Sequence, residues 1–232
     1  MRNCVIVFAK NPIPNHVKTR LIPRLSAEQA AALYRAFLTD WCKTLSELST
    51  IDLIVAYTPE GSQADLQAII GDAVTYIPQI GGGLGERLTS ATHWASDEGY
   101  EKIIITGSDS PTLPLAYISQ AVDALDTCDI VVGPSVDGGY YLIGFSTQNI
   151  TAVVPAIYQG IAWSTKHVFQ QTVERIYKIN AKLKLLPVWY DVDTPEDLGF
   201  LQAHLSALRL AEGSVQAVRT EKILLELSKE NL

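Results

Sequence analysis

A short apolar segment that ends in an acidic turn most constrains the fold of this chain. Within residues 102–106, the isoleucines at 103, 104 and 105 are apolar at consecutive positions rather than at alternate ones, which predicts a strand covered on both faces. Gly107 and Pro111 predict that this strand ends directly afterwards. We therefore expect Asp109 just beyond the carboxyl end of a central strand, at the edge where open α/β sheets bind ligands. The simpler interpretation is that Asp109 only caps the next turn.

Strand and helix patterns alternate along the chain. The expected strands cover residues 3–9, 51–57, 74–78, 102–106, 129–133 and 140–145, with an extended segment at 184–190. The expected helices cover residues 26–48, 62–70, 84–96, 114–125, 164–177 and 194–208. Ser26 with Gln29, and Thr194 with Asp197, have the spacing of helix starts. This alternation predicts a mainly parallel sheet with helices on both faces.

The length of 232 residues and the lack of a linker indicate one domain over residues 1–210. A break at 211–214 precedes a last helix near 215–228, so residues 211–232 form a C-terminal helical extension. An amphipathic helix there is expected to serve packing or the formation of a homodimer.

The composition limits the classes of partner that this chain is expected to bind. The net charge of −7 argues against a generic electrostatic grip on nucleic acid. Cys4, Cys42 and Cys128 show no metal-binding or disulfide spacing, which fits a reduced, cytoplasmic protein. No apolar run is long enough for a membrane span, and no signal-peptide pattern opens the chain. A small-molecule ligand is the expected partner.

The loop after the first strand is the predicted phosphate-binding region. Lys10, Lys18, Arg20 and Arg24 lie within fifteen positions in an otherwise acidic chain. Arginine binds phosphate through two parallel hydrogen bonds, and lysine supplies a compact positive charge. Neither a P-loop nor a GxGxxG fingerprint is present. The alternative is a solvated loop without a ligand.

A glycine-rich segment at residues 79–88 is the second candidate. Gly83 and Gly85 allow a close backbone approach to a nucleotide, and the following helix start offers free N–H groups. Gln79 is expected to read a base or sugar edge, and Arg87 adds a cation. A flexible turn is the competing interpretation.

The third candidate is an acceptor wall with Asp137 as a general base. Its predicted substrate-contacting residues are Gly138, Gly139, Tyr140, Trp163 and Ser164. A plain hairpin turn explains the Asp-Gly-Gly sequence equally well. Ser164 or Thr165 is expected to cap the helix that follows.

Two further acids stand at residues 191 and 193. Side chains two positions apart in an extended segment face the same way, so Asp191 and Asp193 are expected to present two carboxylates together. With Asp109 they predict an all-oxygen site for Mg²⁺ or Mn²⁺. The alternative is that Asp193 only partners a helix N-terminus.

Taken together these motifs resemble a known family. The chain contains, in order, the segments F-A-K-x-P, V-K-T-R-L, G-x-L-G-E-R, G-S-D-S-P, D-G-G-Y-Y-L-I-G, W-S-T and D-V-D-T-P-E-D-L, and the resemblance covers roughly residues 4–205. They resemble the glycosyltransferase-like transferases associated with radical-SAM and selenodomain proteins, some of them assigned to arsenosugar biosynthesis. This family is related to phospholactate guanylyltransferase within the GT-A nucleotide-diphospho-sugar transferase superfamily.

The resemblance implies a three-layer α/β/α sandwich with a mainly parallel mixed sheet. It also implies that Asp109 holds the metal, that Asp193 or Asp191 is the second acid, and that the N-terminal loop contacts the nucleotide. The family has Pro-Gly where this chain has Pro14-Asn15, and asparagine tolerates the positive φ of such a turn.

A metal-dependent transferase that uses an activated nucleotide is the expected function. The main version is a glycosyltransferase that moves a sugar from a nucleotide-sugar to a small acceptor. The first alternative is a nucleotidyltransferase that joins an NTP to a phosphorylated acceptor and releases pyrophosphate. The second alternative is a nucleotide sensor without turnover, whose binding would ignore metal and survive Asp109→Asn.

Overall fold

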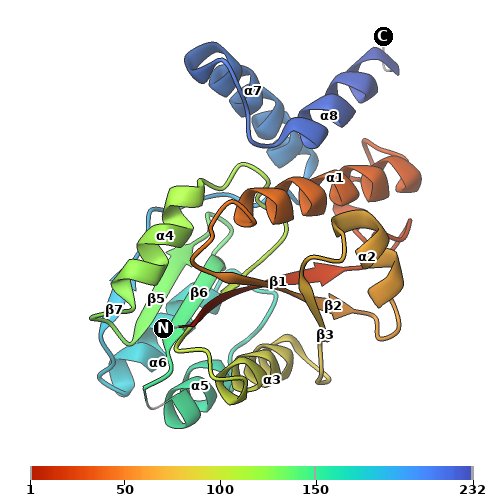
Figure 1. Cartoon of the computed structure of the whole chain (residues 1–232). Coiled ribbons are helices and arrows are strands. Elements are labelled where there is room, and N and C mark those ends of the chain that lie inside the picture. The colour runs from red at the N-terminus through yellow and green to blue at the C-terminus, as the bar shows by residue number, and fades with distance from the viewer. Residues whose placement is uncertain (1, 149, 231–232) are drawn as a thin grey trace.

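A mixed sheet between two layers of helices forms the body of the molecule (Figure 1). The computed structural model describes residues 2–148 and 150–230, and within them the sheet has seven strands in the order β3-β2-β1-β4-β6-β5-β7. The strands are β1 (Asn3–Lys10), β2 (Asp52–Thr58), β3 (Thr75–Pro78), β4 (Lys102–Thr106), β5 (Ile130–Pro134), β6 (Tyr140–Ser146) and β7 (Leu183–Leu185). Strand β6 runs antiparallel to β4 and β5, and the other pairs are parallel. The predicted three-layer α/β/α architecture is confirmed.

The helices cover both faces of this sheet. One face carries α1 (Ala27–Leu45), α2 (Gln63–Ile70), α4 (Leu115–Ala124), α7 (Pro195–Glu212) and α8 (Val218–Glu230). The other carries α3 (Leu84–Asp97), α5 (Ile150–Tyr158) and α6 (Val168–Lys178). In β4, Ile104 packs into the first core, whereas Ile103 and Ile105 pack into the second. The apolar run is therefore buried on both sides, as its sequence predicts.

The predicted helix starts at Ser26 and Thr194 are confirmed. Both side chains accept a hydrogen bond from the backbone N–H three residues later, and both form complete capping boxes.

Other local predictions differ from the structure. Helix α5 was not expected from the sequence. Pro155 lies inside it, and its residues are so uniformly apolar that no amphipathic period is visible. Helix α6 begins only at Val168, because Ser164 has a left-handed backbone with φ 62°. The predicted capping of α6 by Ser164 or Thr165 is therefore wrong. Instead, the Thr165 hydroxyl donates to the Ala162 carbonyl oxygen.

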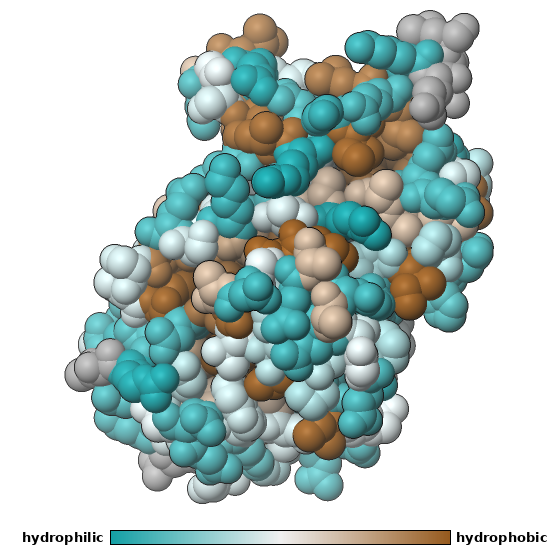
Figure 2. Space-filling model, turned by 45° about the vertical axis from the view of Figure 1, so that its right-hand side comes forward, coloured by the Kyte–Doolittle hydropathy of each residue, from teal (hydrophilic) through white to brown (hydrophobic). Residues whose placement is uncertain are grey.

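The C-terminal helices α7 and α8 form a V that projects beyond α1 (Figure 1). The carboxylate of Asp40 in α1 accepts hydrogen bonds from the backbone N–H groups of Arg219 and Thr220, which fixes the start of α8. Figure 2 shows hydrophobic surface on this upper lobe, where Leu210 and Leu225 are exposed. The division of the chain at residue 211 stays a prediction, and residues 231–232 of the extension fall outside the described part. None of the described helices is both long and apolar enough to cross a membrane.

Candidate active site

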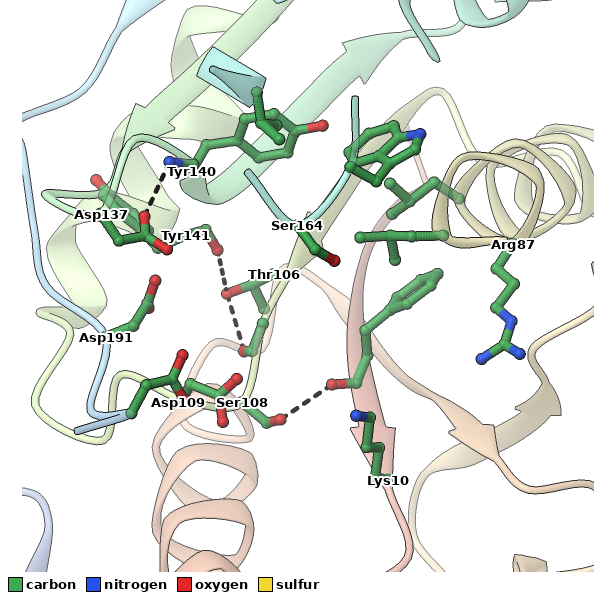
Figure 3. Close-up of a pocket in the computed structure, with 18 of the residues that line it drawn as sticks. Lys10, Arg87, Thr106, Ser108, Asp109, Asp137, Tyr140, Tyr141, Ser164 and Asp191 are labelled. Carbon is green, nitrogen blue, oxygen red and sulfur yellow. Dashed lines mark hydrogen bonds between the residues drawn. The ribbon is translucent and has the colours of Figure 1, made fainter. Parts of the chain in front are cut away.

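A cavity of about 800 Å³ opens at the carboxyl ends of β1 and β4 (Figure 3). These neighbouring parallel strands end at Lys10 and Thr106, so the loops that follow them meet at one edge of the sheet. The cavity wall contains nearly all of the residues predicted from the sequence: Lys10, Lys18, Arg20, Gln79, Gly83, Arg87, Asp109, Asp137, Gly139, Tyr140, Trp163, Ser164, Asp191 and Asp193. Gly85 and Gly138 do not line it.

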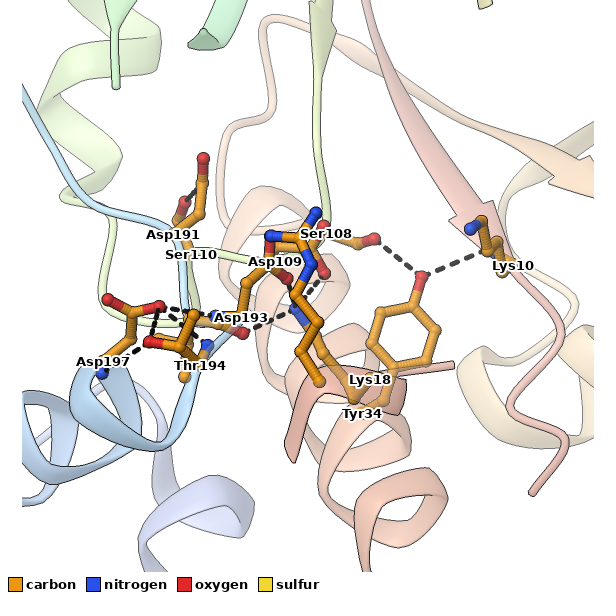
Figure 4. A network of polar contacts seen from close by, with 12 residues as sticks. Lys10, Lys18, Tyr34, Ser108, Asp109, Ser110, Asp191, Asp193, Thr194 and Asp197 are labelled. Atoms are coloured by element: carbon orange, nitrogen blue, oxygen red, sulfur yellow. Dashed lines mark hydrogen bonds and ion pairs between the residues drawn. The ribbon is translucent and has the colours of Figure 1, made fainter. Parts of the chain in front are cut away.

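An ion-pair network joins three of these residues on the side of the cavity near α1 (Figure 4). The Lys18 ammonium lies 2.5 Å from Asp109 Oδ1 and 3.0 Å from Asp193 Oδ1. It also donates a hydrogen bond to the Val192 carbonyl oxygen at 2.7 Å. The Val192 N–H in turn donates to the Asp109 carbonyl oxygen. Two loops that are distant in sequence are thereby tied together at the candidate metal ligands.

Burial and charge oppose each other at Lys18. The side chain is only 3% exposed, and burial alone would lower the pKa of Lys18. The Asp109 and Asp193 carboxylates outweigh burial and raise the pKa of Lys18 well above its usual value. Burial alone would likewise raise the pKa of Asp193, but the Lys18 ammonium outweighs it and the net pKa is lowered. Lys18 and Asp193 are therefore both charged at neutral pH.

Asp191 has a different environment although it is only two residues from Asp193. Its carboxylate accepts hydrogen bonds from the hydroxyls of Ser110 at 2.5 Å and Ser135 at 2.8 Å. Burial raises the pKa of Asp191 to about 6. Across the described residues, no three His, Cys, Asp or Glu side chains gather closely enough to hold a metal ion. The expected three-carboxylate cluster is therefore not formed, because the two serines engage Asp191.

Cations lie across the cavity from these acids. Figure 3 shows Lys10 and Arg87 on the side opposite Asp109, Asp137 and Asp191. In the described part of the chain no carboxylate pairs with Lys10, which is exposed, or with Arg87, which is half-buried. The wall therefore offers positive charge that the protein itself does not neutralise.

The loop that carries the cationic residues has the expected turn. Asn15 adopts φ 65°, which confirms that asparagine preserves a positive-φ conformation where the family has glycine.

Gln79 has one fixed amide orientation. Its Nε2 group donates to the backbone carbonyl oxygens of Ala9 at 3.2 Å and Ala56 at 2.8 Å. Both amide hydrogens are thereby used, so Oε1 is the polar atom that remains for a ligand. The prediction that Gln79 reads a base or sugar edge is narrowed to a role as hydrogen-bond acceptor.

The expected acceptor wall combines turn structure with exposed polar groups. Asp137 stands in the turn between β5 and β6, and its Oδ1 accepts the Gly139 N–H at 2.8 Å. The hairpin interpretation of this segment therefore holds, while Asp137 still lines the cavity. Gly138 has φ 91°, and a Cβ there would lie 2.2 Å from the Lys166 carbonyl oxygen, so its glycine serves packing.

Sequence reasoning missed several lining residues. Tyr34 on α1 donates or accepts a hydrogen bond with Ser108 at 2.7 Å and accepts one from the Lys10 N–H. Nothing in the helical pattern distinguishes Tyr34 from an ordinary core residue. Ser108 directly precedes Asp109 in the predicted turn, and this position could have identified it as a lining residue. Lys166 follows the W-S-T segment and lines the cavity with Thr165.

The carboxylates of Asp109 and Asp193 suit a divalent cation. Lys18 contacts Oδ1 of each, and the exposed Arg20 guanidinium lies 3.8 Å from Asp193 Oδ2, a long contact that a metal ion at the Oδ2 atoms would replace. Both side chains are more than one-third exposed. Mg²⁺ is commonly held by one or two carboxylates together with substrate phosphates and water. The residues present therefore fit a metal ion that arrives with a phosphate ligand.

Comparisons with known proteins agree with this fold and cavity. A bacterial family described as "Uncharacterized protein conserved in bacteria (DUF2064)" matches residues 41–165. A crystal structure from Desulfovibrio desulfuricans G20, provisionally described as a nucleotide-diphospho-sugar transferase, is 34% identical. The match covers 99% of this chain and 96% of that one with a TM-score of 0.87. A cytidylyltransferase from Leptospira borgpetersenii, 15% identical over 100% of this chain and 95% of its own, has the same fold with a TM-score of 0.61.

Curated relatives extend the likeness to named enzymes. The 2-phospho-L-lactate guanylyltransferase of Methanocaldococcus vulcanius is 25% identical over 86% of this chain and 84% of its own length. That of Methanothermobacter thermautotrophicus is 27% identical, and the match spans 60% of each chain. The chain therefore belongs to the DUF2064 family and is a transferase with the nucleotide-diphospho-sugar transferase fold.

Proposed function

We propose that the chain is a metal-dependent nucleotidyltransferase that couples a nucleoside triphosphate to a small phosphorylated acceptor. The observation that carries the proposal is the opposition, within one cavity, of the Asp109–Asp193 carboxylate pair and the unpaired cations Lys10 and Arg87. A triphosphate needs both a metal ion and positive side chains to offset its charge. GTP is the first candidate because the curated relatives are guanylyltransferases.

The proposed reaction is a substitution at the α-phosphorus. An oxygen of the acceptor phosphate forms a bond to the α-phosphorus of the triphosphate. The bond from that phosphorus to the oxygen bridging to the β-phosphate breaks, and its electron pair leaves with pyrophosphate. Lys10, Arg20 and Arg87 would neutralise the leaving pyrophosphate. Asp109 and Asp193 would hold Mg²⁺ or Mn²⁺, which supplies Lewis-acid stabilisation of the phosphate oxygens.

The acceptor is proposed to bind against Tyr140, Trp163, Ser164 and Lys166. These residues line the same cavity, and Lys166 offers a positive charge to an acidic acceptor. A phosphate oxygen is already ionised at neutral pH, so this reaction needs no general base. Asp137 is then a residue of the acceptor wall, and its base role belongs to a different reaction.

Glycosyl transfer is the second candidate. It is favoured by the 34% identity to a protein described as a nucleotide-diphospho-sugar transferase. In that reaction an acceptor hydroxyl must lose its proton, and Asp137 would take it. The two reactions differ in their products, because one releases pyrophosphate from an NTP and the other releases a nucleoside diphosphate from a nucleotide-sugar.

A product assay tests the proposal. GTP, CTP and UTP are incubated with phosphorylated hydroxy acids and Mn²⁺, and pyrophosphate is measured. We expect pyrophosphate release by the unaltered protein, release that is retained in Asp137→Asn, and none in Asp109→Asn or with EDTA. Nucleoside diphosphate release from a nucleotide-sugar that depends on Asp137 would instead establish glycosyl transfer. Nucleotide binding that persists in Asp109→Asn and in EDTA, without any product, would favour a sensor.

A further inference from the structure

We propose that Lys18 is a fixed internal counter-ion of the candidate metal site and not a ligand of the nucleotide phosphates. The proposal rests on the function above, since it concerns the two carboxylates to which that function assigns the metal. The sequence places Lys18 in a cationic loop, and on that ground alone it is expected to bind phosphate. The structure gives it other partners.

The ammonium group of Lys18 has no donor left for a phosphate. An ammonium carries three N–H bonds. These are directed to Asp109 Oδ1 at 2.5 Å, Asp193 Oδ1 at 3.0 Å and the Val192 carbonyl oxygen at 2.7 Å. A phosphate ligand would have to replace at least one of these charged or backbone partners.

The position of Lys18 also opposes such an exchange. Its side chain is 3% exposed, whereas the Asp109 and Asp193 side chains are 40% and 37% exposed. The ammonium lies over the rings of Tyr34 and Phe37, at 5.8 and 5.5 Å from their centroids. Lys18 therefore lies beneath the carboxylates, on the protein side, while the carboxylates reach the cavity (Figure 4).

Two consequences follow for the site. First, Lys18 fixes the Oδ1 atom of both carboxylates, which orients their Oδ2 atoms and sets the geometry of the metal ligands. Second, the ammonium cancels one of the two negative charges, so the site attracts a free divalent cation less strongly. The metal is then expected to bind well only together with the phosphates of the nucleotide.

Two lysine variants separate this role from phosphate binding. Lys18→Met removes the internal charge, and Lys10→Met removes an exposed cation of the same cavity that has no carboxylate partner. Binding of Mn²⁺ alone is measured by electron paramagnetic resonance, and binding of GTP is measured by calorimetry at saturating Mn²⁺. Melting temperatures are recorded for both variants. Lys18→Gln, which keeps a hydrogen-bond donor, replaces Lys18→Met if the latter does not fold.

We expect Lys18→Met to bind free Mn²⁺ at least about tenfold more tightly than the unaltered protein, because the net charge of the site becomes more negative. Its affinity for GTP at saturating Mn²⁺, where the bound metal offsets the extra negative charge, should stay within about twofold of the original. Lys10→Met should do the reverse, with unchanged Mn²⁺ binding and weaker GTP binding. A merely structural role for Lys18 predicts no gain in metal affinity.

The proposal is overturned if Lys18→Met binds free Mn²⁺ no more tightly, or if it loses affinity for GTP at saturating Mn²⁺ as Lys10→Met does. Absence of Mn²⁺ binding to both the unaltered protein and Lys18→Met also overturns it. Absence of GTP binding to the unaltered protein contradicts the proposed function instead. In that case the Mn²⁺ measurement, which needs no nucleotide, still decides the role of Lys18.

Discussion

Asp191 and Asp193 are two positions apart, yet their local contacts shift the pKa values of the two carboxyl groups in opposite directions. The lowered pKa of Asp193 keeps its carboxylate charged beside Lys18, whereas burial raises the pKa of Asp191 to about 6. The difference lies in the partners, since the hydroxyls of Ser110 and Ser135 give Asp191 hydrogen bonds without a positive charge. Burial therefore prevails and favours the protonated acid, although both hydrogen bonds act to lower the pKa of Asp191.

This contrast predicts a pH-dependent contribution to stability. Because the pKa of Asp191 is higher in the folded chain than in the unfolded one, its contribution is present below about pH 4 and is lost as the pH rises through about 6. The shift corresponds to roughly 3 kcal/mol. Asp191→Asn should therefore gain stability relative to the unaltered protein as the pH rises across this window. Urea unfolding in EDTA at several pH values measures it, and a constant difference would contradict the assignment.

Gly85 illustrates a packing role at a position expected to contact nucleotide. A Cβ at residue 85 would lie 2.5 Å from Trp163 Nε1 and 3.2 Å from the Tyr158 carbonyl oxygen. Gly85→Ala should therefore displace the indole and cost about 1–3 kcal/mol of unfolding free energy. Gly83→Ala is the matched control, since nothing lies within 4 Å of its added Cβ. Denaturant unfolding and Trp fluorescence report both changes, and equal stability of the two variants would refute the packing role.

At the scale of elements, helix α7 connects stability to the candidate metal site. Asp197 Oδ2 accepts hydrogen bonds from the N–H groups of Asp193 and Thr194 and from the Thr194 hydroxyl. The capping box therefore holds the backbone of a candidate metal ligand as well as the helix start. The capping box of α1, at Ser26 and Gln29, has the same form, but neither residue lines the cavity.

The two caps give a matched pair of variants. Thr194→Ala and Ser26→Ala should each lower the free energy of unfolding by about 1 kcal/mol. Only Thr194→Ala should also weaken Mn²⁺ binding in the presence of GTP, because it loosens the backbone of Asp193. Thermal unfolding and Mn²⁺ titrations check both effects. Equal metal affinity in the two variants would show that the cap does not position Asp193.

For the whole molecule, the layer architecture could be predicted from sequence because it depends on local patterns. The three consecutive isoleucines of strand β4 and the alternation of strands and helices require a sheet covered on both faces. The hairpin interpretation of the Asp-Gly-Gly turn implies that β6 runs antiparallel to β5, but no residue pattern predicts the antiparallel pairing of β6 with β4. Helix α5 was missed because Pro155 and uniform hydrophobicity hide its period.

Most of the residues that line the cavity could be predicted from the sequence, but the contacts between their side chains could not. Loops at one edge of a parallel sheet must converge, so most of the predicted residues line one cavity. Burial of Lys18 and engagement of Asp191 by serines depend on side chains from distant segments. No spacing rule within the chain reports such pairings.

The most direct test of the central claim is the position of a metal ion and a nucleotide in the cavity. Crystals grown with Mn²⁺ and GTP, examined by anomalous diffraction, locate the metal. We predict one peak about 2.1 Å from the Oδ2 atoms of Asp109 and Asp193, with phosphates toward Lys10 and Arg87 and with Lys18 still beneath the carboxylates. A peak distant from these two aspartates, or phosphates bound away from the cationic wall, would contradict the account.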